Sequence, residues 1–269
     1  MSDASSTAVP ASGPPILEVR AISKRFGAVQ AIERLDFEVK QGEILGIIGP
    51  NGAGKTTAIN LISGVMRPDA GSITLAGDDV TGMRPDRLVR RGVVRTFQAT
   101  TVYQERTVRE NVRRGAFTTL YPGFWPAFLG TGAARAAERR TEAAIGELLA
   151  WLGLGEVAEA EARNLPYGYQ KVLGLGIALV ARPRLAMLDE PAAGLSHDEA
   201  AHVADVIRRT NADGVSLIVV DHNMRFITRL CHRIVVLHHG TELATGTPQE
   251  VTRDPRVVDA YLGTLHEPA

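Results

Sequence analysis

Hydrophobic and polar residues alternate in three short stretches of the first third of the chain. Residues 16–20 read ILEVR and residues 35–39 read LDFEV, and residues 72–76 (SITLA) follow the same pattern more loosely. A period of two puts successive side chains on opposite faces of a strand, so that one face is buried. The pattern therefore predicts half-buried strands that pair antiparallel.

Four further runs are apolar throughout, which is typical of strands that are covered on both faces in a parallel sheet flanked by helices. These runs are residues 44–48 (ILGII), 185–188 (LAML), 217–220 (LIVV) and 234–237 (IVVL). Helical spacing lies between them, with apolar residues at positions 145, 148, 149 and 152 and a similar spacing over residues 203–210. Ser196 stands three residues before Glu199, which is a capping-box pattern and predicts that the second helix begins there.

Composition argues against a nucleic-acid-binding, a membrane-spanning and a disulfide-linked protein. Thirty basic residues balance thirty acidic ones, so there is no electrostatic footprint for nucleic acid. No apolar run approaches the roughly 20 residues that cross a bilayer, and the single cysteine, Cys231, allows no internal disulfide. Residues 1–15 are small, polar and Pro-rich; they lack the features of a secretory signal and are expected to form a disordered tail. We expect a soluble protein that reaches a membrane only by docking.

An aromatic stretch, residues 117–128 (FTTLYPGFWPAF), is broken by two prolines and a glycine, which excludes a regular helix. Two interpretations remain open. The stretch is either an insertion packed on its own domain, the commoner fate of apolar side chains, or a surface that docks a partner.

Residues 49–56 read GPNGAGKT, which matches the phosphate-loop pattern G-x-x-x-x-G-K-[ST] between a predicted strand and a predicted helix. Glycines let the backbone approach phosphates closely, and backbone N–H groups together with the helix N-terminus form an anion cradle. Lys55 is expected to reach the β- and γ-phosphates of a nucleotide, and the Thr56 hydroxyl to bind Mg²⁺. The alternative, a glycine-rich turn that binds nothing, is disfavoured by this strand–loop–helix context.

Two carboxylates follow the apolar strand LAML, namely Asp189 and Glu190. Ligands of open α/β sheets lie beyond the carboxyl ends of the strands, so Asp189 is expected near the Mg²⁺ and Glu190 is placed to orient an attacking water. His222 ends another apolar strand, and Gln98 follows the run VVRTF. Each is uninformative alone, but the order of phosphate loop, glutamine, acid pair and histidine is specific.

In this order the chain resembles an ABC transporter ATPase over about residues 16–263. The resemblance implies that Phe26 stacks on adenine, that residues 165–170 (LPYGYQ) occupy the place of the family signature, and that Glu190, His222, Gln98 and Lys55 are catalytic. The expected ATP contacts are Phe26, Gly49, Pro50, Asn51, Gly52, Ala53, Gly54, Lys55, Thr56 and Thr57 and, across a dimer, Pro166, Tyr167, Gly168 and Tyr169. The expected metal ligands are Thr56, Gln98 and Asp189.

Further motifs, among them RTFQ, TVRENV, DEPAAGL and GTPQEVTRDPRVVDAYLG, resemble the longer of the two ATPase subunits of branched-chain amino acid uptake systems. The implied fold is an α/β P-loop ABC ATPase domain over residues 16–265, with an N-terminal antiparallel β-subdomain and a helical subdomain inserted at about residues 99–181. The implied activity is Mg²⁺-dependent ATP hydrolysis. The implied partners are integral-membrane permease subunits, a second ATPase subunit (identical or different) and, indirectly, a solute-binding protein, at the cytoplasmic face of the membrane.

The signature departs from the family pattern, because Pro166 stands where a serine is usual and Tyr169 where Gln or Glu is common. Pro166 has neither a hydroxyl nor an N–H to offer, and Ser196 stands where the family usually has Asp. One hypothesis is an asymmetric heterodimer, in which this chain's own phosphate loop is fully active and its signature serves a slower site. The other is a tolerated variant, in which backbone N–H groups suffice. Rival functions are an ABC protein acting on nucleic acid, another cargo, or a structural subunit that binds ATP with little turnover.

Overall fold

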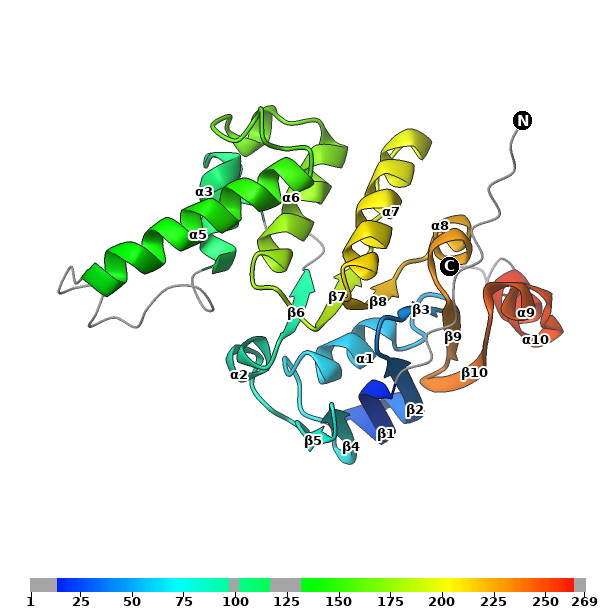
Figure 1. The fold of residues 1–269 in the computed structure, drawn as a ribbon. Coiled ribbons are helices and arrows are strands. Elements are labelled where there is room, and N and C mark those ends of the chain that lie inside the picture. The colour runs from blue at the N-terminus through cyan, green and yellow to red at the C-terminus, as the bar shows by residue number, and fades with distance from the viewer. Residues whose placement is uncertain (1–13, 97–101, 117–131, 264–269) are drawn as a thin grey trace.

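The computed structural model describes residues 14–96, 102–116 and 132–263, whose strands form one mixed sheet (Figure 1). In spatial order its described strands are β5 (Asp78–Asp79), β4 (Ala70–Leu75), β1 (Pro15–Phe26), β2 (Val29–Lys40), β10 (Thr241–Gly246), β9 (Arg233–His238), β3 (Ile44–Ile48), β8 (Ser216–Val220), β7 (Leu185–Asp189) and β6 (Val93–Thr96). β1 begins at Pro15, within the range expected for the tail, and residues 1–13 lie outside the description.

The first half of this sheet is antiparallel, as the alternating pattern predicts. β1 pairs with β2 on one side and β4 on the other, both antiparallel, and β4 pairs with β5. Alternate residues of β1 such as Leu17 and Val19 are buried while their neighbour Glu18 is less so. One face of these strands therefore supplies the core and the other meets solvent.

The second half is mainly parallel, as the solid apolar runs predict. β3 lies between β8 and β9, and β7 lies between β8 and β6, all parallel. In register, Ile47 is opposite Val220, and Val220 is opposite Asp189. The carboxyl ends of β3, β8 and β7 therefore meet at one edge, where such sheets place their ligands.

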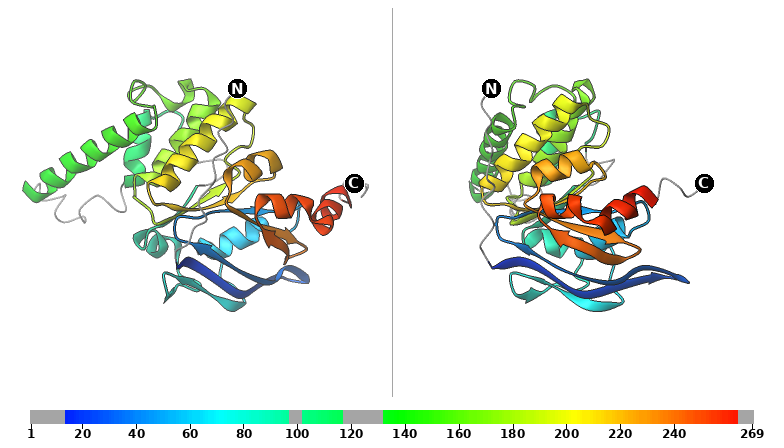
Figure 2. Two further views of the ribbon diagram at one scale, coloured as in Figure 1. Left: turned by 45° about the vertical axis from the view of Figure 1, so that its right-hand side comes forward. Right: turned by 90° about the vertical axis from the view of Figure 1, so that its right-hand side faces the viewer.

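Buried apolar side chains form two layers, one on each face of the parallel strands. Helix α1 (Lys55–Ile62) lies between the antiparallel strands and one face of the parallel strands, where its apolar side packs with Leu45 and Ile47 (Figure 2). The opposite face, with Ile44 and Ile48, is covered by α6 (Tyr167–Leu179), α7 (His197–Ala212) and α8 (Met224–Leu230). Every residue of β3 is thus buried, which explains its unbroken apolar sequence.

The described part of the segment between β6 and β7 is mainly helical and projects away from the sheet (Figure 1). Its described helices are α3 (Val108–Ala116), α5 (Gly132–Trp151), the 3-10 turn η1 (Ala162–Asn164) and α6. The remaining helices are α2 (Pro85–Arg90), α9 (Pro248–Arg253) and α10 (Pro255–Gly263). The α/β class with an antiparallel β-subdomain and an inserted helical subdomain is therefore confirmed.

Both predicted amphipathic helices are present, as α5 and α7, and the predicted capping box is present at Ser196. Within the part of the chain that the structure describes, no helix combines the length and apolarity that crossing a membrane requires. The aromatic stretch 117–128 lies outside the described residues, so its two interpretations stay open.

Candidate functional site

The phosphate loop connects β3 to α1 through three glycines whose backbone φ angles are positive. These angles are +154° at Gly49, +78° at Gly52 and +100° at Gly54, a region that residues with a Cβ rarely adopt. Gly54 directly precedes the first residue of α1, Lys55, and no side chain caps this helix N-terminus. The first N–H groups of α1 are therefore open to an anion, as the sequence predicts.

Two of these glycines are also required by close packing. A Cβ on Gly49 would lie 2.2 Å from the carbonyl oxygen of Leu237 in β9, and one on Gly54 would lie 2.7 Å from the carbonyl oxygen of Ala31 in β2. The loop is thus pressed between β9 and β2 on its inner side. At Gly52 no atom lies within 4 Å of the Cβ position, so this part of the loop faces open space.

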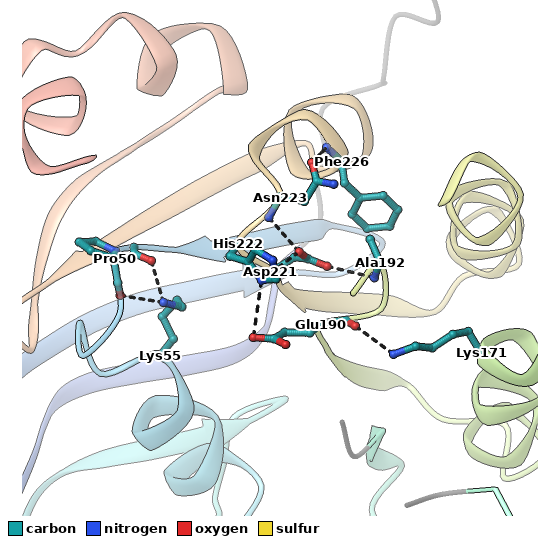
Figure 3. Close-up of polar contacts among 10 residues, drawn as sticks. Pro50, Lys55, Lys171, Glu190, Ala192, Asp221, His222, Asn223 and Phe226 are labelled. Atoms are coloured by element: carbon teal, nitrogen blue, oxygen red, sulfur yellow. Dashed lines mark hydrogen bonds and ion pairs between the residues drawn. The ribbon is translucent and has the colours of Figure 1, made fainter. Parts of the chain in front are cut away.

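Lys55 currently bonds to its own loop. Its Nζ donates to the carbonyl oxygens of Gly49 at 2.6 Å and Pro50 at 2.8 Å (Figure 3). Burial lowers the pKa of Lys55, and the nearby carboxylate of Glu190 acts in the opposite direction. Lys55 and Glu190, far apart in sequence, therefore lie in one site.

Glu190 occupies the turn that follows β7, with a φ of +48°. Its N–H donates to the carbonyl oxygen of Val220 at 2.7 Å, and its own carbonyl oxygen accepts from Nζ of Lys171, in α6, at 3.4 Å. These two bonds therefore act on a backbone in the left-handed region, which residues other than glycine adopt uncommonly. Its side-chain Oε1 lies 3.7 Å from Nδ1 of His222 (Figure 3), so the predicted catalytic acid and histidine are adjacent.

Asp189 forms an ion pair that its sequence motif did not predict. Its Oδ2 accepts from a terminal nitrogen of Arg95 in β6 at 2.8 Å, and the two side chains are only 9% and 8% exposed. Arg95 is thus part of the site, although in the sequence it is one arginine among many, in the run VVRTF.

A second residue missed from the sequence is Asp221, which is fully buried. Its Oδ2 accepts from the N–H of Ala192 at 3.0 Å, and its Oδ1 accepts from the N–H of Asn223 at 2.8 Å (Figure 3). Asp221 therefore ties the loop after β8, which carries His222, to the loop after β7, which carries Glu190. A carboxylate closing an otherwise apolar strand was the available signal. Asn223 itself caps α8 by accepting from the N–H of Phe226.

The signature segment starts α6, with Pro166 as the N-cap and no side chain capping the helix. The N–H of Gly168 donates to Oε1 of Glu199, in the first turn of α7, at 3.0 Å. Hydrogen bonds from Ser196 and from Gly168 lower the pKa of Glu199. Tyr167 and Tyr169 are both exposed. The segment thus contacts α7 and presents its aromatic rings to solvent.

One expected site residue, Phe26, is not joined to this centre in the structure. Phe26 is exposed at the turn of the β1–β2 hairpin, with Nζ of Lys24 5.9 Å from the ring centre; its expected role with adenine stays a prediction. Gln98 lies outside the described residues. By contrast Tyr261 of α10, which no motif predicted, lies near the backbone of Gly49, and burial raises its pKa to about 12.

The oxygen groups fit a magnesium ion carried by a nucleotide. Among the described residues, no group of three or more His, Cys, Asp or Glu side chains could hold a metal by itself. Mg²⁺ is usually held by one or two protein oxygens together with phosphates and waters. The Thr56 hydroxyl in the first turn of α1 and the Asp189 carboxylate match that requirement in their chemistry.

Comparisons with known proteins agree with this geometry. The ABC transporter family matches residues 32–193, and the family described as branched-chain amino acid ATP-binding cassette transporter matches residues 242–267. The high-affinity branched-chain amino acid transport ATP-binding protein LivG of Salmonella typhimurium is 37% identical over 250 residues, covering 93% of this chain and 98% of that protein. The corresponding protein BraF of Pseudomonas aeruginosa is 36% identical over the same length.

Solved structures give the same result. A nucleotide-free ATP-binding cassette of an ABC transporter superposes with a TM-score of 0.82 at 28% identity, covering 92% of this chain and 99% of that one. An ADP-bound cassette of an ABC transporter gives 0.81 at 28% identity, covering 93% and 99%. With phosphate loop, acid pair and histidine at one sheet edge, the chain belongs to the ATP-binding cassette family of ABC transporters.

Proposed function

We propose that this chain is the Mg²⁺-dependent ATPase subunit of an importer for branched-chain amino acids. The observation that carries the ATPase assignment is the meeting of Lys55 and Glu190, which follow β3 and β7 on either side of β8, with His222 beside the carboxylate. The cargo is supported by the names of the similar proteins and by the match at residues 242–267.

Binding begins at the phosphate loop. The open N–H groups of α1 receive the phosphates, and Lys55 exchanges the carbonyl oxygens of Gly49 and Pro50 for β- and γ-phosphate oxygens. Because these carbonyls already hold the ammonium group near the loop, little movement of the side chain is needed. Asn51, Gly52, Ala53, Thr56 and Thr57 complete the cradle, and Phe26 stacks on the adenine.

Hydrolysis requires a water aimed at the γ-phosphorus from the side opposite the leaving group. Glu190 orients this water through its carboxylate, and His222, 3.7 Å away, donates toward the terminal phosphate. Mg²⁺ held by Thr56, Asp189 and Gln98 would supply positive charge between the phosphates. Lys55 stabilises the charge that develops on the transferred group.

A second copy or a related ATPase subunit completes each site through its signature segment. In this chain Pro166 gives no side-chain bond and the N–H of Gly168 is already bound to Glu199. A phosphate arriving from the partner must displace that carboxylate. This supports the asymmetric alternative, in which Pro166–Tyr169 serve the slower of two sites; tolerance of the variant is the competing outcome.

Closure and reopening of the dimer would then drive permease subunits bound near Gln98 and the helical subdomain (about residues 99–181), at the cytoplasmic face of the membrane. A solute-binding protein would deliver the cargo to the permease without touching this chain. No role in nucleic-acid binding is proposed.

The test uses the assembled transporter with Lys55→Ala, Glu190→Gln and the control Lys40→Ala. We expect Lys55→Ala to abolish Mg·ATP binding and Glu190→Gln to bind ATP while losing hydrolysis and amino acid uptake. Lys40→Ala should match the wild type, because Lys40 ends β2 just before β3 begins, whereas the loop follows the other end of β3. Wild-type complex that binds ATP without releasing phosphate would reject the ATPase and favour a structural subunit. Steady hydrolysis in the Glu190→Gln complex would reject the asymmetry.

A further inference from the structure

Arg95 connects three elements that converge under the nucleotide site. It lies in β6, and its terminal nitrogens donate to Oδ2 of Asp189 in β7 at 2.8 Å and to Oδ1 of Asn60 in α1 at 2.6 Å. A third bond, to Oγ of Ser63 after α1, measures 3.2 Å. One guanidinium thus joins the strand that carries the metal carboxylate to the helix that carries Thr56.

This ion pair is buried, so its charges must be compensated within the protein. Arg95 and Asp189 are 8% and 9% exposed, and an ionised carboxylate removed from water to this degree needs a compensating charge and well-formed hydrogen bonds. Arginine provides both in a planar fork with donors on several sides, whereas lysine is a point charge that cannot span two separated acceptors in the same way.

The ion pair uses only one oxygen of the carboxylate. The bond from Arg95 ends on Oδ2, and no hydrogen bond to Oδ1 from a described residue accompanies it. With Oδ2 fixed, rotation of the carboxylate is restricted and Oδ1 has a defined direction. Groups that hold a metal-binding carboxylate in this way set the affinity of the site without touching the metal.

We propose that Arg95 is a positioning residue for the metal site: it fixes Asp189 through Oδ2 and aligns it with α1 through Asn60, so that Oδ1 and Thr56 face the same cation. This inference rests on the proposed Mg²⁺-dependent ATPase. It follows that loss of Arg95 weakens the affinity for Mg²⁺ more than the affinity for metal-free ATP.

The variants are Arg95→Gln, which removes the charge, and Arg95→Lys, which keeps it but loses the fork. The matched control is Arg233→Gln. Arg233 also pairs with a carboxylate that is 3% exposed, Glu43, at 2.8 Å. Arg233 is the first residue of β9 and lies away from the phosphate loop. Both glutamine variants leave a buried carboxylate without its arginine, so thermal unfolding reports the shared structural cost.

The measurements are made on the full chain with purified nucleotide. ATP affinity is measured with EDTA and with Mg²⁺, and bound Mn²⁺ is followed by electron paramagnetic resonance in the ATP-loaded protein. For Arg95→Gln we expect metal-free ATP affinity within about twofold of wild type, but an apparent Mn²⁺ or Mg²⁺ affinity about 10–100-fold weaker and a broadened Mn²⁺ signal. Arg95→Lys should recover part of this loss, and Arg233→Gln should bind metal as wild type does.

Equal metal affinity in Arg95→Gln and Arg233→Gln overturns the proposal. Equal loss of ATP affinity with and without metal also overturns it, because Arg95 would then act on the fold of the loop alone. If Arg95→Gln does not fold, the same comparison of Arg95→Lys with wild type decides, and unchanged metal affinity there rejects the role. Wild-type protein that shows no metal-dependent ATP binding would instead refute the proposed function, which keeps the two failures distinct.

Discussion

Replacement of Gly49 by alanine tests how tightly the phosphate loop is pressed against the sheet. The new Cβ would lie 2.2 Å from the carbonyl oxygen of Leu237 and 3.0 Å from the Cβ of Ala53. A carbon and an oxygen rarely approach closer than about 3.3 Å, so loop and strand must separate by roughly 1 Å. Leu237 belongs to β9, which is paired on both sides, so the strand cannot yield and the loop must move.

The expected cost has two parts. Overpacking typically costs about 1–3 kcal/mol, and forcing a residue with a Cβ into a φ of +154° adds about 1–3 kcal/mol. The total of roughly 2–6 kcal/mol corresponds to a fall in Tm of about 4–24 °C, at about 2–4 °C per kcal/mol for a domain of this size. Because the loop itself moves, ATP affinity should also be lost.

Gly52→Ala is the matched control, measured by the same thermal unfolding without nucleotide. Gly52 also has a positive φ, +78°, but no atom lies within 4 Å of its Cβ position, so only the conformational cost of about 1–2 kcal/mol applies. We expect Gly49→Ala to unfold at a clearly lower temperature than Gly52→Ala. Equal Tm values would refute the argument that contact with β9, rather than backbone conformation, requires glycine at position 49.

Three further predictions concern the stability of the folded chain. Burial lowers the pKa of His232, whose Nδ1 accepts from the N–H of Ile44 at 2.9 Å; the folded pKa lies below the unfolded value of about 6.5. The stability that neutral His232 contributes is therefore present above about pH 6.5 and lost as pH falls toward the folded pKa. The free energy of unfolding measured in urea should decrease as the pH is lowered from about 8 to about 5. The same pH dependence in His232→Gln would contradict this reasoning. Ser196→Ala removes the capping box of α7 and should cost about 1 kcal/mol in urea unfolding, with Ser196→Asp retaining most of it; equal losses would reject the cap. Gly146→Ala, inside α5 with no atom within 4 Å of its Cβ position, should raise stability by about 0.5–1 kcal/mol, and a lower Tm would show an unseen contact.

The parts of this molecule that depend on local spacing were predictable from its sequence. The alternation around Leu17 and the unbroken run in β3 have a direct cause in burial on one face or two. The phosphate loop and the capping box at Ser196 are recognisable because each uses residues within one turn of chain. The order of strands, phosphate loop, acid pair and histidine along the chain was enough to predict the fold class and the family.

The contacts that complete the site were not predictable, because they join distant residues of common types. Arg95 and Asp189 are 94 positions apart, and Gly168 and Glu199 are 31 apart. Nothing in VVRTF distinguishes an arginine that binds a buried carboxylate from one that faces water. Only the pairing of β6 with β7 brings the first pair together, and only the packing of α6 on α7 brings the second.

The strand order also bears on how this protein is made. β3 at residues 44–48 is hydrogen-bonded to β8 and β9, and β2 adjoins β10, so the middle of the sheet is filled by residues 216–246. Until the ribosome has synthesised residues 216–246, β3 has no strand hydrogen-bonded to either of its edges. Pairing over such sequence separations is slow and leaves edges open to wrong partners. We therefore expect nascent chains that stop before residue 246 to depend on chaperones and to aggregate when released.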